Sequence, residues 1–307
     1  MAARRSPPSF ARLLTERPNR ASHDLDRLAP VRVARLMNRE DRRAVAAVGR
    51  VAPRIGAAVA LVTQALSTGG RLFFVGAGTS GRLGVLEAAE CPPTFGTSPR
   101  LVQAIMASGR GAVFRSREGA EDDVRAAARV VRARVRARDV VVGVSASGVT
   151  PFVRAALAAA AARGAATILV ACNPNTGVRV RADVIVAPAP GPEVLAGSTR
   201  LKAGTATKLV LNTLTTASMA RLGKVYGNRM VDVQPRSHKL RERALGLVME
   251  LGGVSRPRAR RLLAAGGGVR VAIVMGRTGR SAKAARRALR EGGNFLAPFI
   301  AAGSTFR

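Results

Sequence analysis

Residues 76–81, with the sequence GAGTSG, combine glycine with two hydroxyl side chains in a pattern that suits anion binding. They follow the apolar stretch 71–75, which predicts a strand, and precede a helix expected to begin near Arg82. Backbone amides, two hydroxyls and a helix N-terminus would then converge, as at many phosphate sites. Neither a Walker A lysine nor the later acidic residue of a dinucleotide fold accompanies the glycines, so the pattern does not favour a nucleotide.

A carboxylate follows shortly after this turn, where Glu90 stands before Cys91 and two prolines that restrict the backbone. A second acidic group, EGAEDD, occupies residues 118–123. Alone it is typical of acidic residues in the first turn of a helix, here expected over 118–138, where the helix dipole favours them. Together with Glu90, it becomes a possible acid and base pair across a pocket.

A second hydroxyl-rich turn, VSASGVT at 144–150, closes a strand predicted over 139–145. Thr150 is followed by a proline, which is favoured in the first turn of a helix. The hydroxyls of Ser145, Ser147 and Thr150 are compatible with a phosphate cradle and, equally, with simple helix capping. Two such turns at neighbouring strand ends favour the first interpretation, because a sugar phosphate needs an anion site with further hydroxyl donors nearby.

Apolar stretches that alternate with helical segments indicate an α/β fold whose parallel sheet is covered on both faces. The expected strands are 71–75, 101–106, 139–145, 166–171 and 184–187. Ligands in such sheets bind outside the carboxyl ends of the strands, where both hydroxyl-rich turns fall.

Further helices are expected over 41–66, with a break at Pro53, and over 204–222. The polar segment 15–41 is expected to cap short helices or to cover a site. After a domain boundary expected near residue 235, the pattern predicts a small, mainly helical domain over 236–307. Its expected elements are helices at 237–250, 255–265 and 281–291 and a strand-like stretch at 269–275.

Length and composition indicate a globular protein: the chain has 307 residues, of which 47% are hydrophobic, enough for a large core. Residues 1–14 are basic and lack the apolar core of a secretory signal, so we expect a disordered lead-in. No apolar run reaches the length of a membrane helix. Only two cysteines, Cys91 and Cys172, are present, which agrees with a reducing, cytoplasmic location. The two histidines, His23 and His238, show no metal-site spacing, and we expect no metal.

The formal net charge of +33 raises the hypothesis of a nucleic-acid-binding protein, and 125–138 is a dense arginine run. The basic residues are, however, spread along the whole chain, and aromatic residues, which serve as stacking platforms for single strands, make up only 3%. Whether binding survives physiological salt would discriminate this class from a small-molecule enzyme.

Several long motifs resemble the N-acetylmuramic acid 6-phosphate etherase family, whose members are sugar isomerase (SIS) domain proteins related to the glucokinase regulatory protein. The resemblance runs from about residue 15 to about 295. Its motifs are GAGTSGRLGVLEAAECPPTFG, EGAEDD, GVSASGVTP, CNPN, GPEVLAGSTRLKAGTATKLVLNTL and GKVYGNRMVDV.

This resemblance implies a three-layer SIS domain over 15–235 and a cytoplasmic homodimeric lyase that uses no cofactor in cell-wall sugar recycling. Such an enzyme splits the lactyl ether of N-acetylmuramic acid 6-phosphate to N-acetylglucosamine 6-phosphate and D-lactate. By motif position, Glu90 matches the acid that protonates lactate, and Glu121 matches the base at C2. The acid must keep its proton near neutral pH, so we expect Glu90 to be buried. The expected substrate-binding residues are Gly78, Thr79, Ser80, Arg82, Ser145, Ser147 and Thr150.

Two positions depart from the family pattern. Val149 stands where the family usually has arginine, which removes a positive charge beside the second turn, and Leu201 replaces the usual Met, a change that conserves side-chain volume. A non-catalytic sugar-phosphate-binding regulator on the same fold remains the alternative to the etherase. The presence of both catalytic glutamates favours the enzyme, because a pure sensor would not need them.

Overall fold

The computed structural model describes residues 13–174, 180–234 and 237–300. Residues 1–12 of the lead-in expected over 1–14, and the domain boundary expected near residue 235, lie outside these ranges. The chain forms two compact units. The first comprises Met1–Ala88 and Arg100–Leu214, and the second comprises Ala89–Pro99 and Thr215–Arg307.

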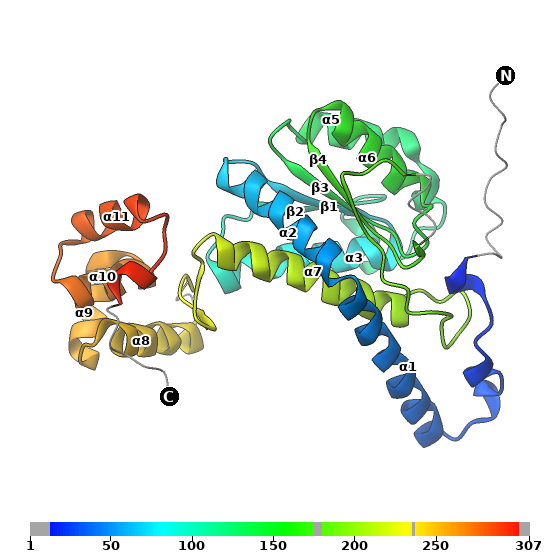
Figure 1. The fold of residues 1–307 in the computed structure, drawn as a ribbon, viewed down its shortest axis with the longest axis horizontal. Helices are drawn as coiled ribbons and strands as arrows, with labels where there is room; N and C mark the ends of the chain where they lie inside the picture. Colours follow the sequence, from blue (N-terminus) through cyan, green and yellow to red (C-terminus); the bar gives the residue numbers. More distant parts are fainter. Residues whose placement is uncertain (1–12, 175–179, 235–236, 301–307) are drawn as a thin grey trace. The chain divides into compact units, whose positions relative to one another are not determined.

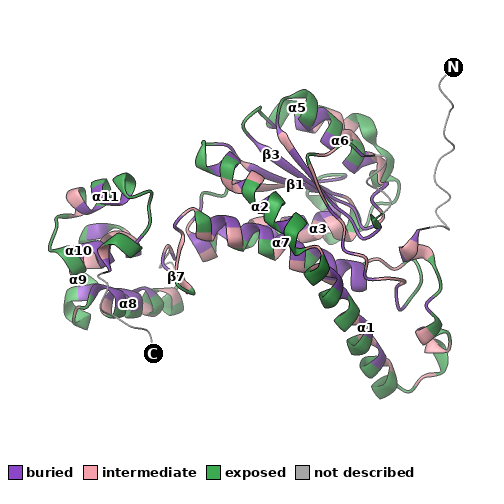
Figure 2. Cartoon of the chain, in the orientation of Figure 1, coloured by how far each residue is buried: buried purple, intermediate pink, exposed green. Residues whose placement is uncertain are grey.

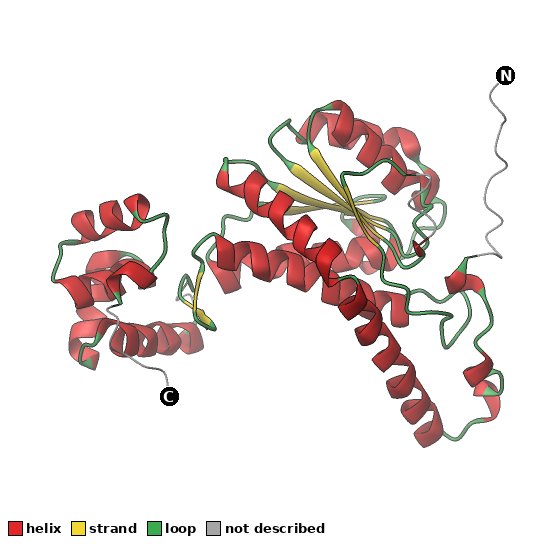
Figure 3. Cartoon of the chain, in the orientation of Figure 1, coloured by secondary structure: helices red, strands yellow, loops and turns green. Residues whose placement is uncertain are grey.

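A parallel sheet of five strands forms the centre of the first unit, as expected (Figure 3). In spatial order the strands are β2 (Val102–Met106), β1 (Leu72–Gly76), β3 (Val140–Val144), β4 (Ala166–Val170) and β5 (Val184–Val186). All four neighbouring pairs are parallel, so the carboxyl ends of the strands share one edge. The sheet is buried on both faces, with every residue of β1 and β3 inside (Figure 2).

Helices cover both faces of this sheet and make the fold the three-layer arrangement expected from the sequence (Figure 1). On one face α5 and α6 pack on Phe73 and Val75 of β1; α2, α3 and α7 lie on the other. The helices that contribute to this unit are α1 (Pro30–Arg50), α2 (Ala52–Ser67), α3 (Gly78–Phe95), α4 (Gly111–Phe114), α5 (Val124–Arg134), α6 (Pro151–Ala162) and α7 (Lys202–Arg221).

Several helix boundaries differ from the sequence prediction. Helix α1 begins at Pro30, eleven residues before the expected start, and Pro53 lies in the first turn of α2, where a missing N–H costs nothing. Helix α3 begins at Gly78, and not near Arg82, and it continues through both prolines to Phe95. The polar segment expected to cap short helices or to cover a site carries short 3₁₀ turns at Leu14–Glu16, Arg20–Ser22 and Leu25–Arg27.

Over the residues that the structure describes, the second unit contains four α-helices after residue 237, a short 3₁₀ helix at Ala297–Phe299 and a two-stranded antiparallel hairpin. The helices are α8 (His238–Gly252), α9 (Arg256–Gly266), α10 (Val269–Thr278) and α11 (Ala282–Glu291); the hairpin pairs β6 (Val225–Tyr226) with β7 (Arg229–Met230). The strand-like interpretation of 269–275 was wrong. Val269, Ala272 and Ile273 are buried on one face of α10, and so short an apolar run has no periodicity that separates strand from helix.

Within the described ranges, no single helix is long and apolar enough to cross a membrane. Helices α1 and α2 have the length and apolar composition of a membrane span only when they are taken together, and the chain bends by 62° between them. Helix α2 packs against the sheet with Ile55, Val59 and Val62 buried, as expected of a core helix.

A buried ionic network joins the N-terminal segment, α1 and the start of α7. The ammonium group of Lys202, which is 1% exposed, donates to Glu40 Oε2 at 2.7 Å and to the carbonyl of Pro192 at 2.8 Å. Asn19 donates to the same Glu40 oxygen at 2.9 Å. The carboxylate of Glu193 accepts the backbone N–H groups of Lys202 and Ala203 at 2.8 and 2.9 Å and so caps α7.

The two buried carboxylates have opposite pKa shifts. Burial tends to raise the pKa of Glu40, but the hydrogen bonds from Lys202 and Asn19 outweigh it and leave the pKa below the usual 4.5. Burial raises the pKa of Glu193 despite the N–H groups that it accepts. Glu40 therefore stabilises the fold above pH 4.5 and loses that contribution as the pH falls through its lowered pKa, whereas the contribution of Glu193 is lost as the pH rises.

Replacing Lys202 should therefore expose the cost of a buried carboxylate that keeps only the largely exposed Arg43, 3.2 Å from Glu40 Oε1, as a cationic partner. We expect Lys202→Met to lower the free energy of unfolding by about 3–5 kcal/mol at pH 7, because Glu40 loses its buried cationic partner. The loss should shrink as the pH approaches 4.5, where a carboxylate without that partner takes up a proton. Urea unfolding at pH 7 and pH 5 measures both effects.

Lys208 provides the matched control, since it lies exposed on the same helix. Its ammonium group donates a hydrogen bond to the Asn212 side chain at 2.6 Å. Lys208→Met should cost less than about 0.5 kcal/mol. Equal losses for the two variants would show that the buried pair contributes no more than a surface lysine.

Candidate active site

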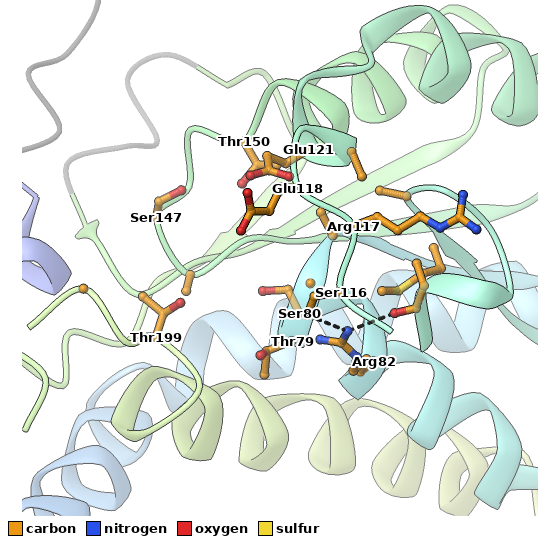
Figure 4. Close-up of a pocket in the computed structure, with 18 of the residues that line it drawn as sticks. Thr79, Ser80, Arg82, Ser116, Arg117, Glu118, Glu121, Ser147, Thr150 and Thr199 are labelled. Atoms are coloured by element: carbon orange, nitrogen blue, oxygen red, sulfur yellow. Dashed lines mark hydrogen bonds between the residues drawn. The ribbon is translucent and has the colours of Figure 1, made fainter. Parts of the chain in front are cut away.

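A pocket of about 430 Å³ lies in the first unit, next to the carboxyl ends of the strands, a volume typical of small-molecule sites. Four segments supply most of its wall: the first turn of α3, the end of β2, residues 112–121 and the turn after β3. Figure 4 shows the hydroxyl and carboxylate side chains that point into it. The pocket lies where the sequence predicts a ligand.

The first turn of α3 carries Gly78, Thr79 and Ser80 into the pocket wall, as expected. The turn fits because strand and helix approach closely: a Cβ on Gly81 would lie 2.6 Å from the carbonyl oxygen of Gly76, and one on Gly76 would lie 2.7 Å from the Gly81 nitrogen. Only glycine permits this approach. The glycine spacing therefore serves helix packing, and the helix N-terminus begins at the pocket.

In the turn after β3, Ser147 and Thr150 line the pocket, whereas Ser145 is buried behind them. The Ser145 hydroxyl accepts the N–H of Gly148 at 3.0 Å and shares a hydrogen bond of 2.7 Å with the Thr150 hydroxyl. Thr150 precedes α6 without capping it through its side chain. Its hydroxyl is therefore held by Ser145 at the pocket wall, which simple helix capping does not explain.

Val149, one of the two departures from the family pattern, is 8% exposed and is not among the lining residues. Its backbone N–H contacts the Ser147 hydroxyl at 3.3 Å. The valine thus fills a buried position beside the turn. An arginine at the same position would have to extend out of this buried position to reach the pocket.

Arg82 lines the pocket, but much of its guanidinium is occupied by the protein (Figure 4). Nε donates to the carbonyl of Val113 at 2.8 Å, and Nη2 donates to the carbonyl of Ala112 at 2.9 Å and to the Ser116 hydroxyl at 3.3 Å. Arg82 therefore fixes the segment that leads to the acidic residues of the pocket.

Glu118 and Glu121 both line the pocket, and Figure 4 shows them beside Thr150. The sequence alone suggested that this acidic group forms the first turn of a helix over 118–138, but neither glutamate lies in that helix. Helix α5 begins only at Val124, and Asp123 caps it by accepting the Ala126 N–H at 2.8 Å. Glu118 therefore lies in an exposed turn and Glu121 in the short 3₁₀ helix Ala120–Asp122, where both exposed side chains can meet a ligand.

Glu90 is not among the residues that line this pocket. It lies on α3 eleven residues after Thr79, about three helical turns further along, in the part of the helix that belongs to the second unit. The expectation that Glu90 is buried was wrong for the single chain, because its side chain is exposed. It projects from the surface of α3, whereas Glu87, one turn earlier, is buried and accepts a hydrogen bond from Asn212 at 2.8 Å.

Sequence reasoning missed several lining residues, notably Glu16 and Thr199. The available signals were the polar segment 15–41, expected to cover a site, and the GSTR motif at 197–200. Both lie far from the two turns in the chain, so only the folded chain places them at the pocket.

Comparison with known protein families identifies the class to which this parallel sheet, with hydroxyl-rich turns at its carboxyl edge, belongs. Residues 54–161 match the Glucokinase regulatory protein N-terminal SIS domain, and residues 120–217 match the SIS domain. A phosphoheptose isomerase from Neisseria gonorrhoeae aligns with 62% of this chain and 97% of its own, at 19% identity and a TM-score of 0.46.

Closer relatives identify the family. The chain is 49% identical over 285 residues to N-acetylmuramic acid 6-phosphate etherase of Microcystis aeruginosa, which covers 92% of this chain and 93% of the relative. It is 51% identical over 291 residues to the protein of that name from Gloeobacter violaceus, at 94% and 95% coverage. The chain belongs to the N-acetylmuramic acid 6-phosphate etherase family.

The contacts of Arg82 predict that it holds the acidic loop in place. In Arg82→Lys a single ammonium cannot reproduce the fork that reaches two carbonyls and a hydroxyl. Losing charge-assisted hydrogen bonds of about 1.5–3 kcal/mol should raise amide hydrogen exchange in 110–123 about 10- to 100-fold. Mass spectrometry of peptides from this segment measures the change.

The exposed Arg115 of the same segment is the control. Unchanged exchange in Arg82→Lys, or equal changes in Arg82→Lys and Arg115→Lys, would contradict the positioning role.

Proposed function

We propose that this protein cleaves the lactyl ether of N-acetylmuramic acid 6-phosphate to N-acetylglucosamine 6-phosphate and D-lactate. The observation that carries the proposal is the meeting, in one pocket, of hydroxyls from both turns with Glu121. About 50% identity to etherases over most of the chain supports the same reaction. The match to the glucokinase regulatory protein domain keeps a non-catalytic sugar-phosphate sensor as the alternative. Release of D-lactate from N-acetylmuramic acid 6-phosphate distinguishes the two.

Phosphate recognition is assigned to the two turns. Thr79 and Ser80, at the N-terminus of α3, offer hydroxyls and backbone N–H groups to an anion. Ser147 and Thr150 offer two further hydroxyls, and Ser145 holds the second of them in place. Gly78, with φ of +54°, lets the backbone enter the helix directly at the pocket.

The reaction follows from the chemistry of a β-alkoxy aldehyde. In the open-chain form of the sugar, the aldehyde acidifies the C2 proton, which the carboxylate of Glu121 removes. Electrons of that C–H bond form the C2–C3 double bond as the C3–O bond to lactate breaks, and Glu90 gives the departing oxygen a proton. Water then adds across the double bond, with its oxygen at C3 and a proton returned to C2.

The exposed position of Glu90 bears on how the acid reaches the substrate. We propose a homodimer in which the Glu90 of one copy serves the pocket of the other. Two exposed side chains provide apolar surface for such an association. Phe114, within the segment 112–121 that contributes to the pocket wall, is 90% exposed, and Leu86, one turn before Glu90, is 45% exposed. We propose the cytoplasm as the location, which agrees with two cysteines that form no disulfide.

Replacing the two glutamates should impair different steps of the reaction. Glu121→Gln should abolish both D-lactate release and exchange of the C2 proton with solvent, each by at least about 100-fold, because both need the base. Glu90→Gln should impair lactate release and leave part of the C2 exchange. Lactate assays and proton NMR in deuterated buffer measure these rates. Wild-type exchange in Glu121→Gln would remove that residue from its role.

Mixing the two variants tests whether the sites are shared. Consider a mixed dimer in which one copy carries Glu90→Gln and the other carries Glu121→Gln. If Glu90 of each copy acts in the pocket of the other copy, this dimer keeps one complete pocket. Random reassortment of the chains should then restore about a quarter of wild-type activity. No recovery in mixed dimers whose formation is confirmed would show that the sites are not shared.

A further inference from the structure

Glu16 contributes a third carboxylate to the pocket from outside the sheet. It belongs to the 3₁₀ turn Leu14–Glu16, its side chain is half-buried, and the Thr15 hydroxyl contacts its Oε1 at 3.4 Å. Nothing in the proposed reaction uses it. A carboxylate brought to a ligand pocket by a separate segment therefore needs its own explanation.

The backbone around Glu16 is fixed on both sides. The N–H of Leu14 donates to the Asn173 side chain at 2.8 Å, and the carbonyl of Thr15 accepts the N–H of Gly197 at 2.9 Å. Asn173 in turn donates to the carbonyl of Ala146 at 3.0 Å, in the second hydroxyl-rich turn. Glu16 is thereby tied to the same turn that presents Ser147.

The neighbouring loop leaves room for this carboxylate. Gly197 has φ of +78°, which disfavours other residues, and a Cβ built there would lie 3.0 Å from Glu16 Oε2. Gly197 and Thr199 line the pocket beside it. The glycine therefore lets the carboxylate lie against the loop without a steric clash.

The charge of Glu16 restricts what it can bind. An ionised carboxylate only accepts hydrogen bonds, so it repels the phosphate and the lactyl carboxylate of the proposed substrate. The ion pairs found among the described residues do not include Glu16. A neutral N–H or O–H donor of the sugar is the partner that remains.

We propose that Glu16 is a specificity-determining residue that accepts a hydrogen bond from a neutral donor of the amino sugar, either its acetamido N–H or one of its hydroxyls. This inference rests on the proposed function, because it assigns a second group of the same ligand. The hydroxyls of the two turns bind the charged end, and Glu16 distinguishes the sugar that carries it.

Binding calorimetry with three ligands tests the proposal without turnover: N-acetylglucosamine 6-phosphate, 2-deoxyglucose 6-phosphate and inorganic phosphate. Glu16→Ala should weaken N-acetylglucosamine 6-phosphate about 10- to 100-fold, the range for a hydrogen bond to a charged group. Inorganic phosphate should bind at least as well as to the wild type, because a negative charge leaves the pocket. If the donor is the acetamido N–H, which 2-deoxyglucose 6-phosphate lacks, Glu16→Ala should bind that ligand as tightly as the wild type does. If the donor is a hydroxyl, the affinity for 2-deoxyglucose 6-phosphate should fall as much as that for N-acetylglucosamine 6-phosphate.

Asp26→Ala is the matched control, since Asp26 is an exposed carboxylate of the same segment outside the pocket wall. It should leave all three affinities unchanged. Unchanged binding of both sugar phosphates by Glu16→Ala, or an equal loss that includes inorganic phosphate, would overturn the proposal and leave Glu16 a support for its segment. A wild-type protein that binds these ligands and releases no D-lactate would instead contradict the proposed function.

Discussion

A buried lysine must find an anionic partner, and in this protein that requirement connects distant parts of the chain. Lys202 at the start of α7 meets Glu40 of α1, and Asn19 bonds to the same carboxylate oxygen. The carbonyl of Pro192 accepts from both donors. These contacts hold the N-terminal segment and the loop before α7 against α1 within the first unit, and those two segments bring Glu16 and Thr199 to the pocket.

The sheet imposes the second constraint on the site. Strand β1 and helix α3 touch at glycines, and a Cβ on Gly84 would lie 2.7 Å from Phe74 Cβ. This approach fixes where the helix N-terminus lies, and it places Thr79 and Ser80 beside the turn after β3. Arg82, one turn into the helix, then binds the carbonyls before the acidic loop. Helix packing and the position of Glu121 thus depend on the same short stretch of sequence.

The parallel sheet, its two hydroxyl-rich turns and most of the helices could be predicted because their signals are local. Strand ends and turn residues stand next to each other in the chain, as at Val144 and Ser145. The helical nature of 269–275 could not be predicted, since a short run of Val and Ile suits either structure. The pocket roles of Glu16 and Arg82 depend on partners 30 or more residues away. The exposure of Glu90 likewise depends on which face of α3 is covered.

The claim that the pocket eliminates lactate and then hydrates the sugar is tested most directly by the fate of water oxygen. The reaction, run in ¹⁸O-labelled water, is followed by carbon NMR, which separates label at C3 from label that enters the C1 aldehyde by exchange. Elimination and hydration predict ¹⁸O at C3 of N-acetylglucosamine 6-phosphate, none in the ether-derived hydroxyl of D-lactate, and solvent deuterium at C2 when the reaction is run in deuterium oxide. Displacement by water at C3 would give the same oxygen label without the deuterium. Label in that lactate hydroxyl with none at C3 would contradict the account, because it would mean direct displacement at the lactyl carbon.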